Sequence, residues 1–180
     1  MRRAADDHRV RRFLSAIGRA AEEAGTVYLV GGATAVVEGW RATTVDVDLC
    51  LEPEQESVLR AIQRLKDELE INVELASPLD FLPELPGWRD RSPFVASEGR
   101  LTIRHFDPYA QALSKIERGH DRDRADVEAM IARGLVEPGR LRELFASIEP
   151  ELYRFPAVDS RAFRRRLDDL APPGAPGGRR

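Results

Sequence analysis

The stretch Tyr28–Leu49, YLVGGATAVVEGWRATTVDVDL, decides the fold of this chain. An apolar, β-rich run over 26–30 predicts a short buried strand, and the Gly31-Gly32 pair directly after it ends that strand. A short helix is expected over 33–38. A second strand is expected over 45–51, because apolar and polar side chains alternate there and mark one buried face. The stretch therefore predicts a strand, a glycine bend, a short helix and a second strand.

Two carboxylates, Asp46 and Asp48, lie on the polar face of the second predicted strand. Residues two apart on a strand point to the same side, with their roots about 6.5–7 Å apart. Carboxylates so close repel each other unless a cation lies between them, and an oxygen-rich site with room for water and phosphate favours Mg²⁺ or Mn²⁺. Gly31 and Gly32 let backbone N–H groups approach an anion. A phosphate cradle beside a metal-binding pair is what phosphoryl or nucleotidyl transfer requires.

Each half of this pattern also has a simpler explanation. Two glycines after a strand usually form only a turn, and an Asp-x-Asp pair on an edge strand is usually solvated. Their order, with thirteen residues between Gly32 and Asp46, makes the combination more specific. A dinucleotide-binding βαβ unit is a weaker alternative, because the Gly-x-Gly-x-x-Gly pattern is missing and the acids follow the glycines too closely.

Apolar periodicity and turn residues predict the remaining elements. These are helices over 6–24, 53–70, 108–118, 121–133, 138–147 and 158–170, a strand over 71–75, a loop over 77–93, and a hairpin of 94–97 with 100–106. The order indicates the α+β class, with a small mixed sheet, helices packed on it and a helical C-terminal part. We expect a sheet core over 1–107, the helical part over 108–170 and a disordered tail over 171–180.

Composition excludes several classes of protein. Of the 180 residues 42% are hydrophobic and 33% charged, and no apolar run approaches the roughly 20 residues of a membrane span. The first ten residues are charged where a signal peptide would be apolar. One cysteine, Cys50, allows neither an internal disulfide nor a cysteine-based zinc site. We therefore expect a soluble, cytoplasmic protein with no membrane partner.

The net charge of −3 hides an uneven distribution. Residues 1–20 and 154–180 each carry +4, whereas residues 21–153 carry −11. Basic ends around an acidic centre fit a site that holds cations while its flanks contact phosphates, although solvated arginine-rich helices would explain the same charges. Arginine outnumbers lysine 26 to 2, so a lysine such as Lys115 is an unusual choice of basic residue here.

The chain resembles the minimal nucleotidyltransferases of the polymerase-β-like superfamily, and among them it is most similar to the AbiEii-type toxins. The similarity covers about residues 26–135 and rests on a glycine pair, an Arg-x-Thr-x-x-Asp-x-Asp pattern, and a late lysine with two following aspartates. In this sequence these residues are Gly31, Gly32, Arg41, Thr43, Asp46, Asp48, Lys115, Asp123 and Asp126.

The late lysine and aspartates also follow a physical pattern. On the helix predicted over 121–133, Asp123 projects into the apolar arc and Asp126 lies on its margin. A carboxylate on a buried face needs a partner, because an unpaired one costs several kcal/mol. Lys115 lies at the edge of the apolar face of the preceding helix. Our hypothesis is that Asp123 orients Lys115 toward a triphosphate; the alternative is a structural Lys–Asp bridge between two helices.

Two departures from the family pattern concern the phosphate and the third acid. Many such enzymes have Gly-Ser at the bend, whereas Gly32 supplies only backbone, so Thr34 or Thr43 is expected to provide the hydroxyl. The third carboxylate is expected to be Glu74, between two apolar residues on the third strand, and Asp80 is its rival. A general base at this point would contribute about 10²–10⁴-fold to the rate.

The resemblance implies a metal-dependent transfer of a nucleoside monophosphate from an NTP to an acceptor hydroxyl, with release of pyrophosphate. It assigns Mg²⁺ or Mn²⁺ to Asp46, Asp48 and Glu74, and it gives catalytic roles to the same three acids together with Lys115 and Asp123. The nucleotide is expected to contact Gly31, Gly32, Thr34, Arg41, Thr43, Lys115 and Asp126.

The implied acceptor is RNA, namely the 3′ end of a tRNA, and the implied biological role is that of a toxin with a cognate antitoxin protein. The basic N-terminal helix and the Arg161–Arg166 helix are candidate RNA contacts. Two alternatives remain open: an antitoxin-type enzyme that AMPylates a partner protein, and a degenerate fold that only binds nucleic acid or protein. The sequence does not specify which NTP is used.

Overall fold

The computed structural model describes residues 3–173, which form two compact units. The first unit comprises the described residues up to Ser77 together with Ser92–Phe106. The second comprises Pro78–Arg91 and the described residues from Asp107 onward. Most of the tail that we predicted to be disordered, residues 174–180, lies outside the described part. None of the helices between residues 3 and 173 has the length and apolar character of a membrane span.

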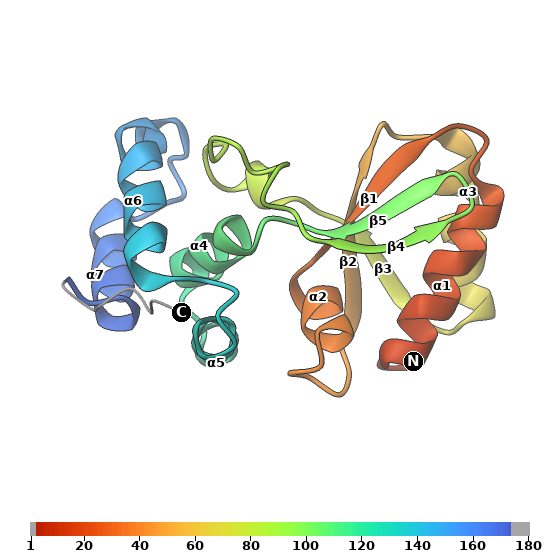
Figure 1. Ribbon diagram of the computed structural model, residues 1–180, viewed down its shortest axis with the longest axis horizontal. Helices are drawn as coiled ribbons and strands as arrows, with labels where there is room; N and C mark the ends of the chain where they lie inside the picture. Colours follow the sequence, from red (N-terminus) through yellow and green to blue (C-terminus); the bar gives the residue numbers. More distant parts are fainter. Residues whose placement is uncertain (1–2, 174–180) are drawn as a thin grey trace. The chain divides into compact units, whose positions relative to one another are not determined.

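A five-stranded mixed sheet is the framework of the first unit (Figure 1). Its strands are β1 (Gly25–Val30), β2 (Asp46–Glu52), β3 (Asn72–Leu75), β4 (Phe94–Glu98) and β5 (Leu101–His105), in the order β3-β2-β1-β5-β4. Strand β1 pairs antiparallel with β2 and parallel with β5, β2 pairs parallel with β3, and β4 pairs antiparallel with β5. The predicted α+β class with a small mixed sheet is therefore confirmed.

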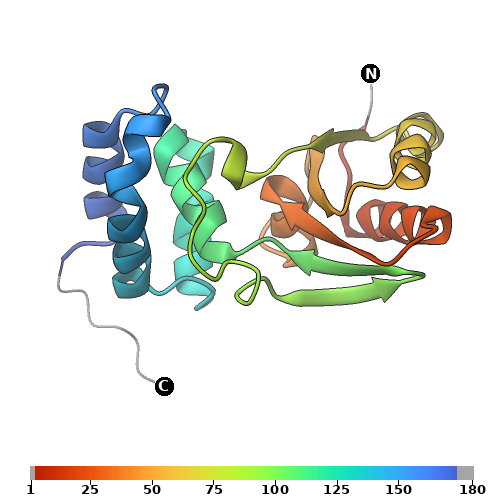
Figure 2. The same ribbon diagram turned by 90° about the horizontal axis from the view of Figure 1, so that it is seen from above.

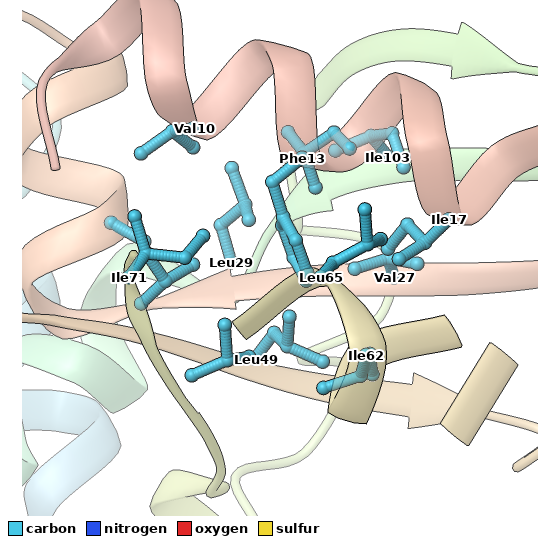
Figure 3. Packing of buried hydrophobic residues seen from close by; sticks show 14 of the residues in the cluster. Val10, Phe13, Ile17, Val27, Leu29, Leu49, Ile62, Leu65, Ile71 and Ile103 are labelled. Atoms are coloured by element: carbon cyan, nitrogen blue, oxygen red, sulfur yellow. The ribbon is translucent and has the colours of Figure 1, made fainter. Parts of the chain in front are cut away.

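One face of the sheet carries the core of this unit. Helices α1 (Asp7–Ala20) and α3 (Glu56–Glu68) supply part of it, and Figure 3 shows their side chains meeting those of the strands. The fully or almost fully buried residues drawn there include Val10, Phe13, Ile17, Val27, Leu29, Leu49, Ile62, Leu65, Ile71 and Ile103. Each such side chain contributes about 1.5–3 kcal/mol relative to exposure. Because Val47 and Leu49 of β2 face this core, Asp46 and Asp48 face the other way.

The second unit is helical. It contains α4 (Pro108–Arg118), α5 (Asp121–Ala132), α6 (Pro138–Ile148) and α7 (Ser160–Leu170), with 3₁₀ turns η1 (Pro78–Asp80) and η2 (Glu149–Arg154). Figure 2 shows these four helices packed side by side, and the rings of Phe145 and Phe163 meet edge to face with centroids 4.8 Å apart. Acidic caps begin three of the helices, because Asp107, Glu137 and Asp159 each accept a backbone N–H from the first turn.

Some predicted boundaries differ from the observed ones for local reasons. The first helix ends at Ala20 rather than at 24, because Gly25 already donates its N–H to Arg100 O, 3.2 Å away, as the chain enters β1. The short helix α2 (Gly31–Val37) begins at the glycines themselves rather than at residue 33. The helix expected over 53–70 begins only at Glu56.

Candidate active site

The glycine bend lies beside Asp48. Strand β1 ends at Val30, which is the register partner of Asp48 on β2, and α2 begins at Gly31 with φ +57°. A Cβ atom placed on Gly31 would lie 2.9 Å from Oδ2 of Asp48. The left-handed backbone favours glycine at position 31, and a larger residue there would also displace the Asp48 carboxylate. The structure thus brings together the bend and one of the two carboxylates that the sequence singled out.

Gly32 packs against a threonine that sequence reasoning did not select. A Cβ on Gly32 would lie 2.0 Å from Oγ1 of Thr44, and this hydroxyl donates to the backbone oxygen of Asp46 at 2.8 Å. Thr44 is itself held by two backbone hydrogen bonds with Ala5, at 2.7 and 2.9 Å. The N-terminal segment therefore fixes the loop that carries the chain into β2.

The two other loop residues chosen from the pattern lie near Thr44 in the chain. Thr43 is exposed and Arg41 is partly buried, both in the connection between α2 and β2. Only the folded structure reveals that Thr44, rather than Thr43, contacts Gly32 of the bend. Its signal in the sequence is weak, because Thr43 and Thr44 are chemically identical neighbours.

The acidic residues form a row across β2 and β3. In the parallel pairing of these strands Asp46 is opposite Asn72, and Asp48 is opposite Glu74, so the four side chains share one face. The amide nitrogen Nδ2 of Asn72 donates to Oδ1 of Asp46 at 2.6 Å and lies 3.3 Å from Oε1 of Glu74. Asn72 was also missed from the sequence, and it connects the predicted metal-binding acid to the predicted third carboxylate. The rival acid, Asp80, is exposed in η1 of the second unit.

The donor set bears on the expected metal ion. Among the described residues, no group of three or more His, Cys, Asp or Glu side chains lies close enough together to hold one. Asp46 and Asp48 alone supply two partly buried carboxylates on one face, beside the backbone of the bend. Mg²⁺ typically keeps several waters and takes one or two carboxylates plus substrate phosphates. The residues present fit an ion held in that way, and they do not fit a cage of three protein carboxylates.

Thr34 makes its contacts inside the first unit. Its buried hydroxyl lies 2.9 Å from the backbone oxygen of Leu29 and 3.2 Å from Nδ1 of His105. The other ring nitrogen, Nε2, lies 2.9 Å from Oε1 of Glu38. Burial lowers the pKa of His105, the charge and hydrogen bond of Glu38 oppose this, and the charge of Arg11 adds to the lowering. The hydroxyl of Thr34 therefore belongs to a buried polar cluster, and its contact with a phosphate stays a prediction.

The late lysine and its aspartates lie in the second unit. Nζ of Lys115 on α4 lies 2.6 Å from Oδ2 of Asp126 and 3.6 Å from Oδ1 of Asp123, both on α5. Asp123 is bound more closely by Arg118, at 2.7 Å. The nearer partner of Lys115 is thus Asp126, whereas we had expected Asp123 to orient it. Burial raises the pKa of Asp123, but the hydrogen bond and charge of Arg118, together with the charge of Lys115, outweigh burial and lower it overall.

The buried Lys115–Asp126 pair explains why these residue types occur at this spacing. Both side chains are 4% exposed, so neither charge could be accommodated without the other. The pair joins two helices, as the structural alternative requires. A role of Lys115, Asp123 and Asp126 at a triphosphate stays a prediction.

A mixed sheet that carries paired carboxylates, one of them against a glycine bend, is consistent with a nucleotidyltransferase core. A family model described as "Nucleotidyltransferase of unknown function (DUF6036)" matches residues 8–165. The chain therefore belongs to this family. Comparison with curated proteins gave no match, and neither did comparison with solved structures. The finer similarity to AbiEii-type toxins is not supported by the family match.

Proposed function

We propose that the protein transfers a nucleoside monophosphate from an NTP to an acceptor hydroxyl, with Asp46 and Asp48 as the metal-binding acids. The observation that carries this proposal is the position of Asp48, whose Oδ2 lies against the left-handed backbone of Gly31. A carboxylate beside the backbone of a glycine bend would place a cation site next to an anion site. A magnesium–triphosphate complex consists of a cation and an anion, and its binding requires that combination of sites.

Each residue of the site has a distinct task in this proposal. Asp46 and Asp48 would hold Mg²⁺, which when bound neutralises phosphate charge and orients the nucleotide. Asn72 holds the carboxylate of Asp46 in place through its 2.6 Å hydrogen bond. The backbone N–H groups of Gly31 and Gly32 would contact the phosphates, because glycine adds no side chain of its own to the bend.

The reaction itself is an in-line substitution at the α-phosphorus. The acceptor oxygen forms a bond to that phosphorus, the bond from the phosphorus to the bridging β-phosphate oxygen breaks, and pyrophosphate leaves with the electron pair. The acceptor proton passes to a base, for which Glu74 is our candidate because it lies opposite Asp48 on the same face. Positioning and electrostatic stabilisation supply most of the rate enhancement in such a reaction.

For the acceptor we propose RNA, with the 3′ end of a tRNA as the specific candidate and a toxin role opposed by a cognate antitoxin. The support is the resemblance described above and the positive charge at both ends of the sequence. Binding to RNA should then weaken steeply with salt, because each neutralised phosphate releases counterions.

The experiment is a labelling reaction with Mg²⁺, each of the four α-labelled NTPs, total tRNA and a cell lysate. Label in tRNA supports the proposal, whereas label in a protein indicates the AMPylating alternative. Asp48→Asn should lose at least about 10²-fold of the rate, because a metal contact supplies several kcal/mol to the transition state. Asp67→Asn, an exposed acid on α3, is the matched control and should keep full activity.

A separate measurement tests whether the fold is catalytically degenerate. Calorimetric titration of the protein with each NTP should show binding in Mg²⁺ that disappears in EDTA. If no NTP binds in a metal-dependent way, the transferase proposal is refuted and a binding module becomes the better interpretation.

A further inference from the structure

Helix α2 is short, and one imidazole contacts both a polar residue of the helix, Thr34, and its C-cap, Glu38. Thr34 and Glu38 are four residues apart and so lie on one face of the helix turn. His105, the last residue of β5, lies between them, with Nδ1 3.2 Å from the Thr34 hydroxyl and Nε2 2.9 Å from the Glu38 carboxylate. Its side chain is 4% exposed. Both ring nitrogens of this buried histidine contact α2 or its C-cap. The residue therefore does more than fill space in the core.

The imidazole is itself fixed to the sheet. Leu29 on β1 is the register partner of His105, and the backbone N–H of His105 donates to Pro93 O at 2.9 Å. The next residue, Phe106, donates its N–H to Leu29 O at 2.9 Å, the same oxygen that the Thr34 hydroxyl reaches. His105 therefore connects α2, through its ring, to the ends of β1 and β5, through its backbone.

Helix α2 also carries the bend. Gly31 is its first residue and lies against Asp48, and Thr34 follows within the same turn. A shift of α2 would therefore move the backbone N–H groups of the bend relative to the carboxylate. In Figure 1 the helix lies at the ends of β1 and β2, within the first unit.

We propose that His105 is a positioning residue: by binding Thr34 and Glu38 together it fixes α2, and with it the Gly31–Gly32 bend, against Asp48. This inference rests on the proposed nucleotide site and adds to it a residue that does not touch the nucleotide. The proton arrangement follows from the distances. The Thr34 hydroxyl donates to Leu29 O, so its oxygen is the acceptor that faces Nδ1, and the Glu38 carboxylate is the acceptor that faces Nε2.

The charged groups that act on the ring are Glu38, the C-cap of α2, and Arg11 from α1. Because burial lowers the pKa of His105 from 6.5, the ring is neutral at pH 8 and gains its second proton only as the pH falls below that value. Protonation breaks neither contact with α2, because Thr34 Oγ1 and the Glu38 carboxylate both accept hydrogen bonds.

The test compares wild type with His105→Phe, which keeps a ring of similar size and removes both hydrogen bonds. Exposed His8→Phe on α1 is the matched control. Two quantities are measured on folded protein at pH 8: amide hydrogen exchange over α2 without nucleotide, and affinity for Mg²⁺ with each of the four NTPs. We expect His105→Phe to speed exchange over 31–37 and to weaken NTP binding by about tenfold, the order expected for a lost hydrogen bond, while His8→Phe changes neither.

A conservative variant separates positioning from a merely structural role. His105→Gln, whose amide can donate to Glu38, should recover part of the NTP affinity that His105→Phe loses and should again slow exchange over 31–37.

Three results would overturn this inference. Unchanged exchange over α2 in His105→Phe would show that the ring does not hold the helix. Faster exchange with unchanged NTP affinity would show that α2 does not position the site. Wild type that binds no NTP at all would refute the proposed function itself, and this inference with it.

Discussion

At the scale of single residues, Gly32 is the most constrained position of the candidate site. Its α-hydrogen faces Thr44, and the space that a Cβ would need is occupied by Thr44 Oγ1 at 2.0 Å and Thr44 Cβ at 2.9 Å. Thr44 cannot easily retreat, because its hydroxyl is bound to Asp46 O and its backbone to Ala5. A methyl group at position 32 therefore displaces either the bend or the start of β2.

We predict that Gly32→Ala lowers the free energy of unfolding by about 1–3 kcal/mol, the usual cost of overpacking. Urea denaturation measures this directly. Thr44→Gly removes both clashing atoms, so the double variant should be more stable than the sum of the two single effects predicts, with a coupling energy of about 0.5–3 kcal/mol. Strict additivity would show that Gly32 and Thr44 are not in the contact described above.

The residues that the sequence could identify are those whose role follows from local spacing. Alternation along one strand is enough to place Asp46 and Asp48 on one face, and the Gly31-Gly32 pair is visible directly in the sequence. Thr44, Asn72 and His105 could not be found in this way. Their contacts depend on how β2 aligns with β3 and on where β5 ends, which are properties of distant parts of the chain.

At the scale of elements, the Lys115–Asp126 ion pair joins α4 to α5. Variants of this pair can distinguish a role of Lys115 at the nucleotide from a purely structural bridge between the helices. Because both side chains are buried, removing one partner leaves an uncompensated charge, whereas replacing both with apolar residues is often neutral or stabilising. Stability and activity can therefore be measured independently at this site.

We predict that Lys115→Met alone costs about 3–5 kcal/mol of stability and that Lys115→Met with Asp126→Leu restores most of it. Thermal unfolding measures this effect, and the labelling reaction then reports function. If the restored double variant is inactive, the Lys115–Asp126 pair serves the nucleotide; if activity returns with stability, the pair is only a bridge. Arg124→Met, which breaks an exposed pair with Glu128, is the control and should change stability by less than about 1 kcal/mol.

The prediction of elements succeeded where apolar spacing is long and regular. The helix expected over 108–118 has those bounds in the structure, because a proline begins it, Asp107 caps it and Gly119 ends it with φ +69°. The turn η2 was not predicted, since Pro150 and two glutamates around it give no apolar period over Glu149–Arg154.

At the scale of the whole molecule, each unit is assembled from two separate segments. Most of the loop expected over 77–93, namely Pro78–Arg91, belongs to the second unit, and Leu82, Leu85 and Trp88 in this stretch are buried. The last residue of the stretch, Arg91, binds fully buried Asp107 at 2.5 Å, which closes the second unit where the chain returns to it. No local sequence pattern predicts that the chain passes from one unit to the other and back, since this depends on which surface the loop covers in the folded protein.

The division into two units predicts which residues a bound ligand should protect from amide exchange. A ligand that binds only the folded state stabilises it by an amount set by its concentration relative to Kd, about 2.7 kcal/mol at 100 times Kd. We predict that Mg²⁺ with the preferred NTP raises the melting temperature and slows amide exchange at the bend and at Asp46–Asp48. These residues belong to the first unit, so the protection should begin there.

Removal of the metal tests whether this stabilisation and protection depend on the cation. Excess EDTA should abolish both effects, because without a cation the carboxylates repel the triphosphate that the bend attracts. Asp48→Asn should be insensitive to Mg²⁺–NTP even though its lost charge relieves that repulsion, whereas Asp67→Asn should respond as wild type does. Protection that persists in EDTA, or that Asp48→Asn retains in full, would mean that the nucleotide binds elsewhere and that the acidic pair of β2 does not hold the metal.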